Sequence, residues 1–166
     1  YDAHTMDSLV RRQDWTFLLS DKVYRYNLPF SEKEETEKYL VSVPIKNNRE
    51  IKIPSGFISG QNIYNLFSDL TIGYHDSLDF KKLPIPFACV ASNLVDGQEV
   101  IQDCGVLPLA MRASMAIPGA FAPVRKDGMV LVDGGISNNF PVDIAKAMGA
   151  DIIIGVDVQA ELKDAS

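Results

Sequence analysis

The residues best suited to chemistry are an aspartate and two glycines that follow a short apolar run. Asp133-Gly134-Gly135 comes directly after residues 129–132, which read Met-Val-Leu-Val. Such a run is typical of a strand buried on both faces, and sites in α/β sheets form at the carboxyl ends of strands. A carboxylate there can accept a hydrogen bond from a serine hydroxyl and take its proton during attack on an ester carbonyl. Taken alone, the tripeptide favours a plain turn whose aspartate bonds backbone amides.

No serine in the chain has the surroundings of an activated nucleophile. The motif Gly-x-Ser-x-Gly, whose small residues permit a sharp strand-to-helix turn, does not occur in the 166 residues. Ser114 has Arg112 two positions before it and Ala116 two positions after it, and Ser59 has Phe57 two positions before it. We assign neither serine as a nucleophile and expect Ser114 to pack or cap near the site.

The elements that must position Asp133 alternate between strands and helices. Apolar runs predict strands at residues 87–91, 129–132 and 152–156, and residues 99–102 can return as a further strand. Helices are predicted between them, at residues 107–115 and 141–148. This order predicts an α/β fold, with a mostly parallel sheet between two helical layers.

The amino-terminal half is less regular. Apolar spacing predicts a helix and a short second helix within residues 5–19, the second around Trp15. A charge run at residues 31–38 precedes a predicted hairpin of residues 39–43 and 49–53. Residues 60–70 carry the apolar pattern of an amphipathic helix.

Composition excludes several classes of protein. The hydrophobic content of 46% and charged content of 23% are ordinary for a single globular domain. The net charge of −6 argues against a nucleic-acid partner and supplies no polybasic patch for an anionic membrane surface. A dinucleotide-binding Gly-x-Gly-x-x-Gly is absent from the sequence, and the aspartates show no metal-ligand spacing. We therefore expect neither a cofactor nor a metal.

The two cysteines, Cys89 and Cys104, lie in no Cys-x-x-Cys motif. Cys89 falls in an apolar run, which favours a buried free thiol. A disulfide between the two cysteines stays open.

Four blocks together resemble the carboxyl-terminal half of a patatin-like phospholipase domain. They are the strand and turn at residues 86–97, the Arg-Ala-Ser…Pro…Phe…Pro block at 112–123, the Asp-Gly-Gly…Asn-Asn…Pro block at 133–141, and Met-Gly-Ala-Asp at 148–151 before an apolar run. A fainter match covers residues 1–19. The resemblance divides the chain into the end of a nucleophile-side helical region (1–19), a variable insert or cap (20–82) and a core with the aspartate (83–158), all within one partial domain (1–166).

The resemblance implies a lipid acyl-ester hydrolase of the phospholipase A or lysophospholipase type. In that family a Ser-Asp dyad works without histidine, so Asp133 becomes the proton acceptor. The serine, in Gly-x-Ser-x-Gly, and a glycine-rich oxyanion loop are expected upstream of Tyr1, which makes the three-layer domain incomplete on its amino-terminal side and this chain alone inactive. The alternative is a non-catalytic module of the same origin that binds lipid or protein.

Further residues receive roles from this reading. Met111, Met115, Ile117 and Phe121 can line an acyl-chain groove, although core packing is the simpler role for them. Residues expected near the site are Gly134, Gly135, Asn138, Asn139, Arg112 and Ser114, with Asn138 or Asn139 capping the helix at 141–148. The expected partners are a lipid or acyl-ester substrate, a membrane surface that the chain encounters transiently, and a second copy of the chain at an uncovered sheet edge.

Overall fold

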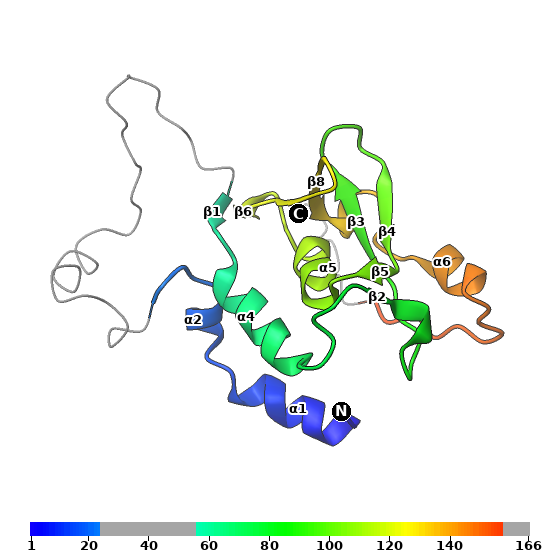
Figure 1. The fold of residues 1–166 in the computed structure, drawn as a ribbon, viewed down its shortest axis with the longest axis horizontal. Coiled ribbons are helices and arrows are strands. Elements are labelled where there is room, and N and C mark those ends of the chain that lie inside the picture. The colour runs from blue at the N-terminus through cyan, green and yellow to red at the C-terminus, as the bar shows by residue number, and fades with distance from the viewer. Residues whose placement is uncertain (24–55, 158–166) are drawn as a thin grey trace, which may run out of the picture.

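A computed structural model describes residues 1–23 and 56–157, and its centre is a four-stranded sheet (Figure 1). The strands are β3 (Cys89–Asn93), β4 (Glu99–Gln102), β7 (Val124–Lys126) and β8 (Met129–Asp133), in the order β4-β3-β8-β7. Every neighbouring pair in this sheet is antiparallel. Ala91 of β3 lies opposite Asp133 of β8, which places the aspartate on the last residue of its strand.

Tight turns explain the antiparallel pairing. Asp127 and Gly128 join β7 to β8 and have φ values of 50° and 78°. Positive φ at both loop residues is required by the type I′ hairpin turn, for which Asp-Gly is a preferred sequence. The loop between β3 and β4 is also short, and Asn93 N–H donates to the Gln98 carbonyl oxygen at 2.9 Å. Strands joined in this way run in opposite directions.

Helix α5 (Leu107–Ser114) packs against the sheet through small side chains (Figure 1). Its Ala113 forms a core with Ala91 of β3 and Leu131 of β8, and all three are at most 1% exposed. Alanines on both surfaces let the helix approach the strands closely. A second core at the beginning of α5 holds Phe80, Leu107 and Ala110.

The amino-terminal helices form as their sequence predicts. Helix α1 (Ala3–Arg12) begins at Asp2, whose carboxylate accepts from Thr5 N–H at 2.8 Å. Helix α2 (Trp15–Leu18) begins in the same way at Asp14. Both are side-chain caps of the kind that satisfies the free amides of a first helical turn. Helix α4 (Gln61–Leu70) confirms the amphipathic helix expected at residues 60–70 and contacts α5.

Short elements complete the described part. Strand β1 (Gly56–Ile58) pairs parallel with β6 (Gly119–Phe121), and β2 (Leu78–Asp79) pairs antiparallel with β5 (Cys104–Gly105). The remaining helical elements are η2 (Phe80–Lys82), η3 (Gly134–Ile136) and α6 (Val142–Ala147). Among the helices of residues 1–23 and 56–157, none combines the length and apolar character that crossing a bilayer requires.

The structure has the mixed helices and strands of an α/β protein, but two expectations about its sheet are wrong for the described residues. The sheet is antiparallel rather than mostly parallel: the turns described above reverse the chain between β3 and β4 and between β7 and β8, and β3 and β8 also pair antiparallel. Residues 152–156 form no strand, and the side chains of Ile152 and Ile154 are 85% and 87% exposed. An apolar run becomes a strand only when a neighbouring strand pairs with its backbone, and none of the described segments does so here.

Other expectations are shifted or lie elsewhere. The strand predicted at residues 87–91 forms at Cys89–Asn93, and the helix predicted at 141–148 forms at Val142–Ala147. The charge run at 31–38 and the hairpin at 39–43 and 49–53 lie outside the described residues.

Candidate functional site

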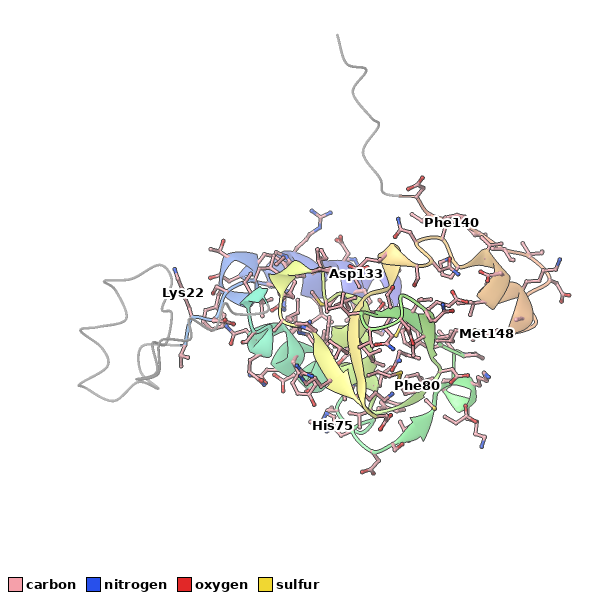
Figure 2. The ribbon with its side chains drawn as sticks, turned by 90° about the horizontal axis from the view of Figure 1, so that it is seen from above. Lys22, His75, Phe80, Asp133, Phe140 and Met148 are labelled. Carbon is pink, nitrogen blue, oxygen red and sulfur yellow. The ribbon has the colours of Figure 1, made fainter. Side chains whose placement is uncertain are left out.

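Asp133 lines an open hollow of about 320 Å³ at the end of β8. The hollow is bounded by β3, the end of α5, and the turn that follows Asp133. Its lining residues are Cys89, Val90, Ser114, Asp133, Gly134, Gly135, Asn138, Asn139 and Pro141. In Figure 2, Asp133 lies where β8 meets this turn, well away from His75. The predicted site residues Ser114, Gly134, Gly135, Asn138 and Asn139 are therefore brought together with the aspartate.

The carboxylate of Asp133 is held by the turn that follows it. Its Oδ1 accepts from Gly135 N–H at 2.7 Å, and its own backbone N–H donates to the Ala116 carbonyl oxygen at 2.9 Å. The first contact is the backbone bond that a plain turn predicts. Because the carboxylate also lines the hollow, Asp133 can both stabilise the turn and act as a chemical group in the hollow.

The space around the turn requires glycine at position 134 and leaves little room for a side chain at position 135. A Cβ added to Gly134 would lie 2.2 Å from the backbone oxygen of Val90, so only glycine fits against β3. A Cβ added to Gly135 would lie 2.8 Å from Asn139 Oδ1 and 3.0 Å from Asp133 Oδ1. These contacts keep the backbone of the turn close to the strand and close to the carboxylate.

Ser114 lines the same hollow as Asp133 and lies beside Cys89, a lining residue that the sequence does not predict. Burial raises the pKa of the Cys89 thiol to about 11, although the Ser114 hydroxyl and the Lys126 ammonium group each act to lower it. Both Cys89 and Cys104 are free thiols, so the disulfide that stayed open is not formed. The sequence signal that placed Cys89 in an apolar run correctly indicated a shielded thiol.

The difference between the two thiols is testable by alkylation. At pH 8 a thiol with a pKa of about 11 is thiolate in about one molecule in a thousand, and the thiolate is the reactive form. We expect exposed Cys104 to react with iodoacetamide at least tenfold faster than Cys89, as measured by peptide mass spectrometry. Because the Cys89 pKa is raised, its rate should climb between pH 8 and pH 11. Equal rates for both cysteines at pH 8 would contradict the shielding of Cys89.

Asn138 connects the turn to its surroundings. Its Nδ2 donates to Glu99 Oε2 at 3.0 Å and to Asp143 Oδ1 at 3.2 Å, which links the turn to β4 and α6. Neither Asn138 nor Asn139 caps α6, whose N-cap residue is Pro141 with no side-chain cap bond. The capping prediction is therefore wrong, because Asn138 reaches a carboxylate inside the first turn of α6 instead of its free amides.

Arg112 lies outside this hollow and links two backbone segments elsewhere in the molecule. Its Nη2 donates to the Ser59 and Ala122 carbonyl oxygens at 2.8 Å and 3.0 Å, and its guanidinium lies 5.0 Å from the centre of the Phe121 ring. The side chain is 4% exposed, and Nη1 is buried with no hydrogen-bond partner among the described residues. Desolvation lowers the pKa of Arg112, partly offset by the Asp21 carboxylate. Arg112 thus joins the amino-terminal end of α4 to the end of β6.

Replacing Arg112 should reduce stability without removing a charge. We expect Arg112→Lys to lower the free energy of unfolding by about 1–3 kcal/mol, because an ammonium group cannot reproduce the planar donors that reach two carbonyl oxygens. Arg125→Lys, at an exposed position of β7, is the matched control and should change it by less than about 0.5 kcal/mol. Urea denaturation measures both, and similar losses in the two variants would contradict the role given to Arg112.

The four apolar residues expected at an acyl groove do not line the hollow around Asp133. Met111 packs against the core of Phe80 and Leu107, and Phe121 is buried beneath Arg112. Ile117 is 52% exposed, and Met115 ends α5. Their contact with an acyl chain stays a prediction.

Histidines and metal ligands do not gather at Asp133. His4 is exposed, and exposed His75 lies 2.8 Å through Nε2 from the Ser68 carbonyl oxygen. Within residues 1–23 and 56–157, no group of three or more His, Cys, Asp or Glu side chains has the arrangement of a metal site. The groups available for chemistry in the hollow are the Asp133 carboxylate, the Ser114 hydroxyl, the Cys89 thiol and the amide groups of the turn.

Comparison with known proteins adds a family. The sequence profile described as patatin-like phospholipase matches residues 11–146. An uncharacterized NTE family protein of Mycobacterium tuberculosis is 35% identical over 104 residues, which are 63% of this chain and 28% of that protein. Patatin-like phospholipase domain-containing protein 7 of Rattus norvegicus is 33% identical over 106 residues, which are 63% of this chain and 7% of that protein. Human patatin-like phospholipase domain-containing protein 6 is 32% identical over 109 residues, or 64% of this chain and 7% of that protein. The match thus spans less than a third of the length of each of these relatives.

Proposed function

Since this chain belongs to the patatin-like phospholipase family, we propose that it supplies the aspartate half of a Ser-Asp dyad in a lipid acyl-ester hydrolase. Family membership supports hydrolysis of lipid esters in general terms. We further propose that the enzyme is of the phospholipase A or lysophospholipase type. We also propose that the dyad is divided between this chain and a nucleophile outside it.

One observation carries the proposal: the Asp133 carboxylate lines the hollow at the end of β8, with its Oδ1 held by Gly135 N–H. Among residues 1–23 and 56–157, no group forms a hydrogen bond with the second carboxylate oxygen, and Asp133 is partly exposed. No histidine lines the hollow. A carboxylate in this position can accept the proton of a serine hydroxyl directly, as a two-residue mechanism requires.

The proposed reaction has two halves. In the first, the serine oxygen bonds to the ester carbonyl carbon while its proton passes to Asp133, and the alcohol leaves with that proton as the acyl-serine forms. In the second, water attacks the acyl-serine, gives a proton to Asp133, and the proton returns to the serine oxygen as the fatty acid leaves. Asp133 is a carboxylate before and after each half, so proton balance is kept.

We propose that the remaining catalytic groups come from outside this chain. A Gly-x-Ser-x-Gly segment would bring the nucleophile, and a glycine-rich loop would bring the oxyanion donors, which typically account for about 10²–10³ of the rate. The mostly parallel, three-layer sheet would then be a property of the completed domain. Residues 1–19, 20–82 and 83–158 would serve as the nucleophile-side helices, the variable cap and the aspartate-bearing core.

The proposal also names the molecules that this chain would contact. Met115 and Ile117 would meet the acyl chain, and the lipid substrate implies an encounter with a membrane surface but no nucleic acid. An uncovered sheet edge, at β4 or β7, would pair with a second copy when the completing strands are missing. The alternative function is a non-catalytic module that binds lipid or protein.

The test compares two forms of the protein. This chain alone is expected to show only background hydrolysis of a short acyl ester, and a form extended to include Gly-x-Ser-x-Gly is expected to hydrolyse it. Absence of hydrolysis in a folded, extended form would favour the non-catalytic module. The residue-level test, Asp133→Asn in the extended form, opens the Discussion.

A further inference from the structure

A pair of hydroxyl groups, one on buried Ser92 and one on exposed Ser137, lies behind the Asp133 turn. Ser92 of β3 is 1% exposed, and its Oγ lies 2.6 Å from Ser137 Oγ, which follows η3. Ser92 is opposite Val132, the residue before Asp133, in the register of β3 and β8. The pair therefore joins the strand beside the aspartate to the far end of the turn after it.

Either hydroxyl can donate across the contact between Ser92 Oγ and Ser137 Oγ. Ser137 Oγ also lies 3.4 Å from the Gly134 carbonyl oxygen and donates to it. If Ser137 O–H points to Gly134, then Ser92 O–H must donate to Ser137 Oγ, because each hydroxyl has one proton. In that arrangement the hydrogen bonds run from Ser92 through Ser137 to the Gly134 carbonyl oxygen.

The hydrogen bonds of Ser92 and Ser137 act on a turn whose other end is already fixed. The backbone of Gly134 lies directly against the Val90 carbonyl, where no Cβ fits. The Gly134 carbonyl oxygen also accepts from Ser137 N–H at 3.1 Å and Asn138 N–H at 2.9 Å. Between these two anchors, Gly135 N–H faces the Asp133 carboxylate at 2.7 Å.

We propose that Ser92 and Ser137 form a positioning pair that holds the turn so that Gly135 N–H aims the Asp133 carboxylate into the hollow. Neither serine lines the hollow, so neither touches substrate. Their role is to restrict the backbone after Asp133, and thereby the side-chain direction of Asp133. The inference rests on the proposed function for its catalytic consequence, but the restriction itself is a property of this chain.

The restriction can be measured without any enzymatic activity. In an Asp-Gly sequence the glycine nitrogen attacks the aspartate side-chain carboxyl carbon, water is lost, and the resulting succinimide hydrolyses largely to isoaspartate. The attack needs rotation of the backbone and side chain at the aspartate, so a held turn suppresses it. The chain contains three such sequences, at Asp133-Gly134, Asp96-Gly97 and Asp127-Gly128. The last two lie in the exposed loops between paired strands and serve as internal controls.

The variants are Ser137→Val and Ser137→Thr, which have nearly the same shape and differ in the hydroxyl. We expect Ser137→Val to raise the rate of isoaspartate formation at Asp133 about tenfold, with Ser137→Thr close to the parent protein and the rates at Asp96 and Asp127 unchanged. In the extended, active form, Ser137→Val should lower kcat about tenfold at constant KM, and Ser137→Thr should restore it. Ser92→Ala, which removes the other hydroxyl, should reproduce Ser137→Val in both measurements.

Several outcomes would overturn the inference. Equal isoaspartate rates at Asp133 in the Val and Thr variants would show that the hydroxyl does not hold the turn. A rise at all three Asp-Gly sequences would show general loosening, and an unchanged kcat in Ser137→Val would show that holding the turn does not serve catalysis. Failure of the proposed function looks different: hydrolysis would persist in Asp133→Asn, while isoaspartate formation would still separate Ser137→Val from Ser137→Thr.

Discussion

Asp133→Asn is expected to remove most of the ester hydrolysis of a form of the protein that includes an upstream Gly-x-Ser-x-Gly. An amide keeps the shape of the carboxylate, and its oxygen can still accept from Gly135 N–H, but it cannot take the serine proton. General-base catalysis typically contributes about 10²–10⁴ to the rate, so a loss of that order is expected. The loss should appear equally in kcat and in kcat/KM, because the proton is transferred in the transition state.

This experiment needs two precautions. Asparagine followed by glycine deamidates readily, which would regenerate aspartate at position 133, so freshly prepared protein should be checked by mass spectrometry and paired with Asp133→Ala. His4→Ala and His75→Ala are the matched controls and should leave the rate within about twofold, which separates a Ser-Asp dyad from a Ser-His-Asp triad. An undiminished rate in verified Asp133→Asn protein would refute the dyad assignment.

Gly134→Ala should have the second largest effect, and on both stability and activity. The added methyl group would lie 2.2 Å from the Val90 carbonyl oxygen and 2.6 Å from its carbon, which are backbone atoms that cannot rotate away. The turn must therefore move off β3. We expect a loss of about 1–3 kcal/mol in the free energy of unfolding, as is typical of overpacking, and a loss of hydrolysis of at least about 10²-fold from the displaced carboxylate.

Gly135→Ala is the control in the same turn. Its methyl group would meet the Asn139 and Asp133 side chains, at 2.8 Å and 3.0 Å, and these can rotate. Thermal denaturation should therefore show a smaller fall in Tm for Gly135→Ala than for Gly134→Ala. The opposite ranking would mean that contact with β3 does not fix the turn.

The sequence predicted where Asp133 lies in the fold. The apolar run before Asp133 predicted its place at the end of a strand, and β8 ends on that residue. Ser114, Asn138 and Asn139 do lie around the same hollow. The catalytic role of Asp133 stays a prediction.

The sheet was harder to predict, for physical reasons. Asp127-Gly128 is a hairpin signal in the sequence, and giving it full weight would have predicted antiparallel β7 and β8. The composition of residues 152–156 was read as a buried strand, but burial depends on a neighbour, which local sequence does not supply. Ser92 and Ser137 could not have been paired from sequence, since two isolated serines 45 positions apart carry no periodic signal.

The Asp127-Gly128 hairpin also bears on the order in which the domain folds. Its strands are neighbours in sequence, and hairpins of this kind form in about 1–10 μs. The pairing of β3 with β8 instead closes a loop of several dozen residues, and such non-local contacts have a larger entropic cost and form more slowly. We therefore expect the strand that carries Asp133 to form early, before β3 arrives with Val90 and Ser92. The aspartate would acquire its final surroundings only in the last steps of folding, so that partly folded chains contain the strand but not the site.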